Sequence, residues 1–274
     1  MSSYEPHMLF CRRMTPLRLR QMTWTEVEAL DPSRVVAILP VGAVEAHGPH
    51  LSLLTDGVIA DAMAGAAAEK LEGAGLVPVL LPPLDYSAAL FAEQFPGTIS
   101  VEPETIKTLI FDIASGLARW GVPIVSIANA HLDPAHLTSL HAATNALRAA
   151  GKIKVAFPDL TQPPWGSRLT EEFKSGACHA GQFEGSIVMA SRPELVREEI
   201  RKQLAPNHKS LSKAILEGRS TFAEAGGPQA YFGDPAAATV EEGAETIQIL
   251  GEILAEAALR ELGMQMPAAE LELA

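Results

Sequence analysis

The chain has 274 residues, of which 47% are hydrophobic and 20% charged, and its formal net charge is −12. This length and balance are typical of a globular protein with a sizeable core. The negative charge disfavours nucleic acid and anionic membranes as partners. Two cysteines are too few for a secreted disulfide scaffold, and no apolar run has the length of a signal peptide or membrane span, so we expect a cytoplasmic protein.

Short apolar runs alternate along the chain with Ala- and Leu-rich segments of helical pattern. The predicted strands cover residues 35–41, 76–81, 122–128 and 153–157, and the predicted helices cover 57–73, 103–121, 134–151 and 241–262. Continuous rather than alternating apolar runs suit parallel strands that are covered on both faces. The pattern predicts an α/β fold with a mainly parallel central sheet flanked by helices. We expect one domain over 1–274, with a short N-terminal extension and a flexible tail at about 264–274.

Residues that can bind metals or substrates, or take part in catalysis, follow each predicted strand. These are Glu45 and His47 after the first, Asp85 and Ser87 after the second, His131 and Asp133 after the third, and Trp165 after the fourth. In open α/β sheets, ligands bind beyond the carboxyl ends of the strands. The sequence therefore predicts a functional site at this edge of the sheet.

The first motif is the loop of residues 39–50, followed by Asp56 at the start of the next helix. Glu45, His47 and Asp56 offer mixed nitrogen and oxygen ligands, which suit zinc, manganese or iron. The two oxygens of Asp56 would allow it to bridge two metal ions. The alternative is a polar loop in which Asp56 only caps the helix.

The second motif covers residues 129–134. His131 and Asp133 are two positions apart, so in an extended segment both side chains face the same way. Asp133 is also well placed to cap a helix that begins at Pro134. The ligand role and the cap role are compatible with each other.

The third motif covers residues 178–186. His179 and Glu184 would serve as a general acid or base and as a metal ligand or its orienting partner, unless both are plain surface residues. A rival within enzymes is a Cys178 nucleophile beside His179. Inhibition by chelators rather than by thiol alkylation would separate the two hypotheses.

Together these blocks resemble the creatininase (creatinine amidohydrolase) family. Residues 40–56 match its first block nearly residue for residue, and 95–100 and 231–243 resemble two further blocks in the right order. The resemblance implies a three-layer α/β fold that assembles as a homohexamer. It also implies two divalent metal ions per chain (zinc, manganese or iron) that cleave a C–N bond of a small amide by attack of metal-bound hydroxide.

The resemblance also implies residue roles. Glu45, Asp56 and His131 would hold one metal, and His47 and Asp56 would hold the other. Asp133 or Glu184 would complete the second site, and the sequence does not choose between them. His179 matches a proton-transfer histidine of the family, with Glu184 as a further catalytic candidate, and Ser87 matches a serine that contacts substrate.

Departures from the family pattern concern the substrate. Ser175 and Gly176 stand where creatinine-hydrolysing members have a Trp-Asp pair, and Leu132 stands where they have tyrosine. Trp165 could replace the missing ring. We therefore expect a small amide, cyclic amide or formamide other than creatinine. The alternative is a catalytically altered metal-binding scaffold, because Ala130 and Gly185 also depart from the pattern. A nucleotide-binding domain is disfavoured, since no glycine-rich phosphate loop follows the first strand.

Overall fold

The computed structural model describes residues 16–266, and its centre is a five-stranded sheet in which every pairing is parallel. The strands, in the order β1-β3-β2-β4-β5, are β1 (Leu17–Arg18), β3 (Val77–Leu80), β2 (Val35–Val41), β4 (Ile124–Asn129) and β5 (Lys154–Ala156). The central pair β2 and β4 ends together, with Val41 opposite Asn129. This register brings the loops that follow β2 and β4 to the same edge of the sheet.

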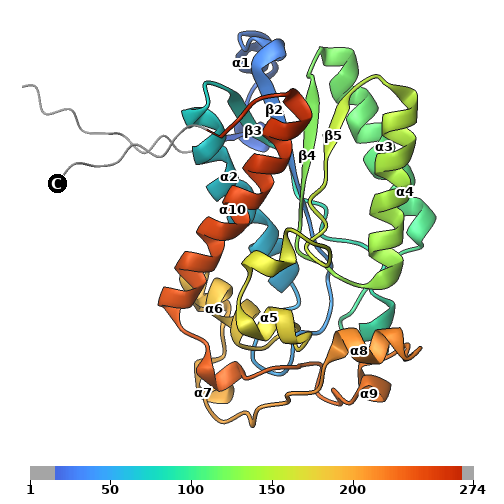
Figure 1. Cartoon of the computed structure of the whole chain (residues 1–274), viewed down its shortest axis with the longest axis vertical. Coiled ribbons are helices and arrows are strands. Elements are labelled where there is room, and N and C mark those ends of the chain that lie inside the picture. The colour runs from blue at the N-terminus through green and yellow to red at the C-terminus, as the bar shows by residue number, and fades with distance from the viewer. Residues whose placement is uncertain (1–15, 267–274) are drawn as a thin grey trace, which may run out of the picture.

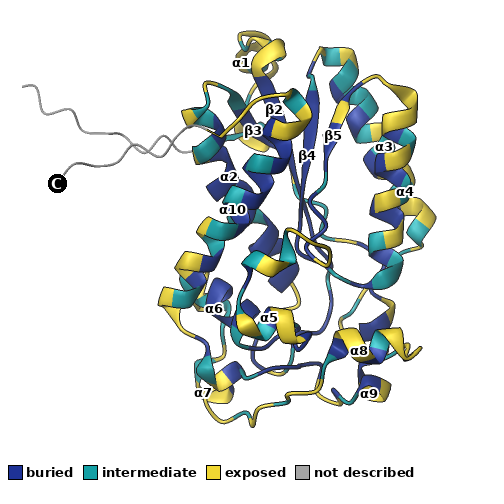
Figure 2. Ribbon diagram, viewed as in Figure 1, coloured by how far each residue is buried: buried dark blue, intermediate teal, exposed yellow. Residues whose placement is uncertain are grey.

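Helices cover both faces of the sheet, so the fold has three layers (Figure 1). One face carries α2 (Thr55–Gly73), α6 (Gln182–Ser191) and α10 (Val240–Leu262), and the other carries α3 (Pro103–Trp120) and α4 (Pro134–Ala150). Val36 and Ile38 of β2 pack towards the first group, while the alternate residues Val35 and Ala37 pack towards the second. Figure 2 shows the resulting buried sheet between helices whose outer faces are exposed.

Shorter elements gather beyond the carboxyl ends of the strands, in the lower part of Figure 1. They are α5 (Glu171–Ser175), α7 (Glu198–Arg201), α8 (Leu211–Leu216) and α9 (Phe222–Ala225), whereas α1 (Trp24–Glu28) lies at the opposite end. Single 3-10 turns are η1 (Leu19–Gln21), η2 (Pro32–Arg34), η3 (Leu90–Ala92), η4 (Gly166–Arg168), η5 (Pro193–Leu195) and η6 (Pro235–Ala237). The small elements therefore enclose the edge at which the sequence predicts a site.

The predicted fold class is confirmed, and each predicted strand and helix is present with its ends shifted by at most two residues. Gly121 and Gly151 end α3 and α4 with positive φ angles of 93° and 64°, as helix-terminating glycines often do. The two-residue strand β1 is an addition. Residues 1–15 and 267–274, on which most of the expected N-terminal extension and tail fall, lie outside the described residues. Among residues 16–266, no helix is long and apolar enough to cross a membrane.

Candidate metal centre

The loop after β2 is held tightly against the start of α2. A Cβ atom on Gly42 would lie 2.6 Å from the Gly57 backbone nitrogen and 2.8 Å from the Asp56 Cβ, so only glycine fits here. This contact places Asp56 beside Glu45 and His47. Leu54, not Asp56, is the N-cap residue of α2, and it makes no capping hydrogen bond. The cap interpretation of Asp56 therefore finds no support, and its carboxylate faces two histidines instead.

Asp56 lies between His131 and His47, with one carboxylate oxygen towards each ring. Its Oδ2 is 3.0 Å from His131 Nδ1, and its Oδ1 is 3.2 Å from His47 Nε2. Glu45 Oε1 is 3.3 Å from His131 Nδ1, and Glu184 Oε2 is 3.5 Å from His47 Nε2. Three groups of potential ligands result. Two of them share Asp56, namely Glu45–Asp56–His131 and His47–Asp56–Glu184, and the third is Glu45–His47–His179.

The outer nitrogens of both histidines are bound to backbone carbonyls. His131 Nε2 lies 2.8 Å from the Ala88 oxygen, and His47 Nδ1 lies 3.1 Å from the Glu45 oxygen. Each outer N–H donates to its carbonyl, which leaves the inner nitrogen of the neutral ring with a lone pair facing carboxylates. Lone pairs and carboxylates repel one another unless a cation lies between them. Backbone anchoring of this kind is common for histidines that bind metals.

The cluster is buried and rich in negative charge. Glu45, Asp56 and Glu184 are 3%, 1% and 4% exposed. Burial would lower the pKa of His47, but Asp56, Glu184 and Glu45 outweigh it and raise this pKa to about 10. Burial, with Asp56 and Glu45, raises the pKa of Glu184 to about 8, although His47 opposes this. Both pKa values are raised, which means that the cluster holds protons more strongly than water does. The cluster therefore attracts positive charge.

Three atoms of the cluster test the fit to metal ions directly. Glu45 Oε2, His47 Nε2 and Asp56 Oδ2 are buried and make no hydrogen bond. Buried polar atoms are almost always paired, so several unpaired atoms within one buried cluster are a strong indication that the cluster binds an ion. Carboxylate oxygens and imidazole nitrogens are the donors that zinc and manganese take in proteins. The residues present therefore fit divalent metals.

His179 lies against the cluster from the segment between α5 and α6. Its Nε2 donates to the Ala46 carbonyl at 2.9 Å, and its Nδ1 is 3.8 Å from Glu45 Oε1. The ring is stacked between His47 and Phe222, with both centroid distances at 4.3 Å. Burial, and then the charge of His47, lowers its pKa well below the ordinary value. The neutral ring thus presents a fixed Nδ1 lone pair to the site.

Asp133 lies nearby, but both of its carboxylate oxygens are occupied. Oδ1 accepts from the Ala135 backbone N–H at 2.8 Å, capping α4, and Oδ2 accepts from the Phe91 N–H at 3.0 Å. Among the described residues, the groups of potential ligands include Glu184 and not Asp133. The structure thus favours the cap role of Asp133.

Two residues expected at the substrate lie elsewhere. Ser87 is fully buried, and its hydroxyl is bonded to His136 Nδ1 rather than facing a cavity. The Trp165 ring lies under the guanidinium of Arg260, which belongs to α10 and is 5.1 Å from the ring centroid. Leu132, in contrast, lines a cavity of about 750 Å³ that contains Glu45, Asp56, His131, His179 and Glu184 in its wall.

Cys178 also lines this cavity, but its thiol is not activated. Burial, followed by the charges of Glu184 and Glu172, raises the pKa of Cys178 to about 12. A thiol nucleophile needs the thiolate form near neutral pH. The cysteine-nucleophile hypothesis therefore lacks its essential group.

A family model described as creatinine amidohydrolase matches residues 20–258, which is most of the chain and includes every residue of the cluster. The chain belongs to the creatininase family.

Two curated proteins illustrate the range of the family. A mycofactocin precursor peptide peptidase of Mycobacterium ulcerans (strain Agy99) is 31% identical over 210 residues, which cover 75% of this chain and 77% of the relative. A creatinine amidohydrolase of Pseudomonas putida is 28% identical over 194 residues, covering 64% of this chain and 72% of the relative. This creatininase-family chain is thus similar to hydrolases named for quite different substrates.

Solved structures agree with the fold. A crystal structure of creatinine amidohydrolase has a TM-score of 0.69 and 27% identity, and covers 93% of this chain and 100% of its own. A creatininase described with manganese and a mutant creatininase of zinc–zinc type are each 25% identical, with TM-scores of 0.69 and 0.68 and the same coverage. Metal-binding hydrolases of this family therefore share the fold of this chain.

Two residues near the creatininase-family cluster, the partly buried Glu172 and the fully buried His136, were not predicted as functional. Glu172 of α5 accepts backbone N–H groups from Phe183 at 2.8 Å and Asp234 at 2.7 Å. It thereby fixes the first turn of α6, which carries Glu184. His136 joins Ser87 to Asn129, whose side chain bonds the backbone of the His131 segment. Only Asn129 stands in a motif, so the sequence offered little signal for the other two.

Proposed function

We propose that this protein is a binuclear metal-dependent hydrolase that cleaves a C–N bond of an amide. The observation that carries the proposal is the position of Asp56, whose two carboxylate oxygens face the inner nitrogens of two different histidines. A carboxylate in this position can bridge two metal ions. Membership of a family of metal-dependent amidohydrolases supports the reaction class.

Glu45, Asp56 and His131 would hold one metal ion, and His47, Asp56 and Glu184 would hold the other. Glu184 is preferred to Asp133 because the oxygens of Asp133 are already bonded to backbone N–H groups. The three ligand carboxylates carry three negative charges, whereas two divalent ions carry four positive charges. The surplus positive charge suits a site that must attract an electron-rich substrate oxygen.

The bound metals would lower the pKa of a water molecule towards neutrality and polarise the substrate carbonyl. The chain's own contribution is proton transfer by His179. Its Nε2–H is committed to the Ala46 carbonyl, so Nδ1 is the atom that accepts a proton from the attacking water and passes it to the leaving nitrogen. Stacking between His47 and Phe222 holds this ring in place during the transfer.

The first substrate candidates are small amides, cyclic amides and formamides. Creatinine is disfavoured because Ser175, Gly176 and Leu132 line the cavity where a stacking ring and an acidic partner would be needed. A second candidate is the amide bond of a peptide. It is supported by the peptidase name of a 31% identical relative and by a cavity of about 750 Å³, which is large for a small cyclic amide.

Metal content measured by mass spectrometry tests the centre. We expect two ions per wild-type chain, neither ion in Asp56→Asn, and one in Glu184→Gln. Asp133→Asn is the matched control, because asparagine also caps helices well, and it should retain both ions. Two ions in Glu184→Gln with a loss in Asp133→Asn would reverse the ligand assignment. Two ions in Asp56→Asn would exclude its bridging role.

Turnover tests the reaction. The protein loaded with manganese or zinc is screened against lactams, imides, formamides and short peptides, and a chelator should abolish any hydrolysis until metal is restored. If the protein binds two ions yet hydrolyses none of these compounds, the metal-binding scaffold becomes the better hypothesis. The expected hexamer and cytoplasmic location stay predictions, and sedimentation velocity checks the first of them.

A further inference from the structure

The cavity beside the metal centre is larger than the centre requires. It has a volume of about 750 Å³, and the metal-centre residues form only part of its wall. Protein cavities that bind ligands run from roughly 300 to 1,000 Å³, and the upper part of this range holds drug-sized molecules. The remaining space must therefore accept a part of the substrate that does not react.

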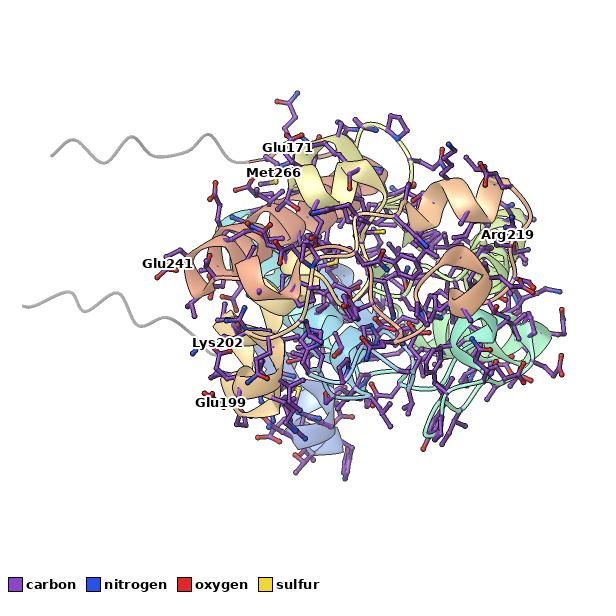
Figure 3. All side chains as sticks on the ribbon, turned by 90° about the horizontal axis from the view of Figure 1, so that it is seen from below. Glu171, Glu199, Lys202, Arg219, Glu241 and Met266 are labelled. Atoms are coloured by element: carbon purple, nitrogen blue, oxygen red, sulfur yellow. The ribbon has the colours of Figure 1, made fainter. Side chains whose placement is uncertain are left out.

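The wall away from the metal centre is mainly apolar. Its large side chains include Phe91, Leu132, Leu137, Phe173, Ile215 and Phe222. They come from the loops after β3 and β4 and from α4, α5, α8 and α9. Figure 3 looks onto this end of the molecule, with Glu171 of α5 and Arg219 beyond α8 at its periphery. Several separate segments thus contribute apolar surface to one space.

The charged groups of this wall are already paired within the protein. The Lys174 ammonium bonds to Glu171, and the Lys213 ammonium lies 3.8 Å from Glu217. Asp133 caps α4, as described above. The side chains of Lys174 and Lys213 are 37% and 75% exposed, and solvent screens charges at such positions, so they contribute little to the recognition of a group inside the cavity. Apolar contact is the main interaction that this wall offers, alongside the hydroxyl and amide groups of Thr161, Gln162, Ser167, Ser175, Ser210 and Ser212.

We propose that this apolar cavity binds a bulky aliphatic or aromatic group of the substrate. The substrate class is then an amide that carries such a group beside its scissile bond. This inference rests on the proposed function, because the metal centre supplies the end of the cavity at which the bond is cleaved. It separates the protein from hydrolases of small polar amides, for which an apolar wall provides no binding energy.

Binding of alkyl hydroxamates to the metal-loaded protein tests the proposal without requiring turnover. The hydroxamate group chelates metal ions, and its alkyl chain would enter the apolar cavity. Calorimetry with aceto-, butyro-, hexano- and octanohydroxamate should show the dissociation constant falling by roughly three- to fourfold for each added methylene. A dissociation constant that is independent of chain length would overturn the proposal.

Substitutions in the cavity wall test whether the cavity causes the dependence of hydroxamate affinity on chain length. Leu216 lines the cavity yet is 88% exposed, so Leu216→Asp cannot unfold the core, and Leu137→Asp places a charge deeper in the wall. Both should flatten the dependence on chain length while leaving acetohydroxamate binding unchanged. Leu109→Asp is the matched control, because Leu109 is an exposed leucine of α3 outside the cavity. An unaltered slope in both cavity variants contradicts the proposal.

One arm of the experiment does not depend on metal. Octanamide should displace the dye anilinonaphthalenesulfonate from the metal-free protein, and more weakly from Leu137→Asp. If metal binding fails but octanamide still displaces the dye, the proposed hydrolase falls while the apolar cavity stands. If two metal ions bind, but octanamide does not displace the dye and longer hydroxamates bind no more tightly than acetohydroxamate, the proposed hydrolase stands and this inference falls.

Discussion

Glu172 is expected to stabilise both the fold and the proposed metal centre, although its hydrogen bonds go to the backbone of Phe183 and Asp234 and not to a proposed metal ligand. Its carboxylate accepts the Phe183 and Asp234 backbone N–H groups, and joins α5, α6 and the segment after Phe232. Gly181 and Gly233 lie so close to it that a Cβ on either would lie within 2.4 Å of a carboxylate oxygen. Glu172→Ala leaves both N–H groups without their acceptor. At about 1–3 kcal/mol for each, unfolding should become easier by about 2–6 kcal/mol.

The assay is urea unfolding of the metal-free protein, with metal affinity measured separately by chelator competition. Glu172→Gln keeps one acceptor oxygen and should lose about half as much stability. Glu171→Ala is the control, because that neighbouring side chain is 93% exposed and should change unfolding by less than about 0.5 kcal/mol. Metal affinity should fall in Glu172→Ala, since α6 carries Glu184. A loss no larger than that of the control would refute the reasoning.

Three further predictions concern the site. His179→Ala should retain both metal ions by mass spectrometry and lose most turnover; loss of an ion would make His179 a ligand. Cys178 should resist iodoacetamide at pH 8, because burial raises the pKa of its thiol to about 12, and rapid modification would contradict this raised pKa. In metal-free protein, the pKa values of His47 (about 10) and Glu184 (about 8) lie above their unfolded values. The stability that these two groups contribute should therefore be lost as pH rises towards 10, and less so after metal is added. The lowered pKa values of His136 and His179 act in the opposite direction, so total stability should also fall below neutral pH.

Sequence patterns located the main strands and helices because each is long enough to show its periodicity. β1 escaped because Leu17–Arg18 has only two residues, and its place depends on pairing with β3 and on the contact between Arg18 and Asp61 at 2.6 Å. The edge of the sheet that carries the site was predictable, since parallel strands end on the same side. Local sequence patterns therefore predicted the main strands and helices and the edge of the sheet at which the candidate site lies.

The ligand set was harder to predict, because its members come from distant segments. Local sequence allowed both Asp133 and Glu184, and only the fold brings Glu184 within 3.5 Å of His47. The same fold turns both oxygens of Asp133 towards backbone N–H groups. Glu172 lies 62 positions from its partner Asp234, so no local spacing could reveal it. The sequence left the choice between residues open where a role depends on tertiary contact.

Ala130 and Gly185 are the two departures from the family pattern that support a scaffold without catalysis. They have different structural consequences. A Cβ on Gly185 would lie 3.1 Å from the Ala238 Cβ, so this position concerns the packing of α6 against the segment before α10. Ala130, in contrast, lines the cavity beside His131. Its methyl group changes the space available to a substrate and adds apolar surface, without removing a potential ligand. Both departures are therefore compatible with a retained reaction and an altered substrate, which is the combination that the apolar cavity favours.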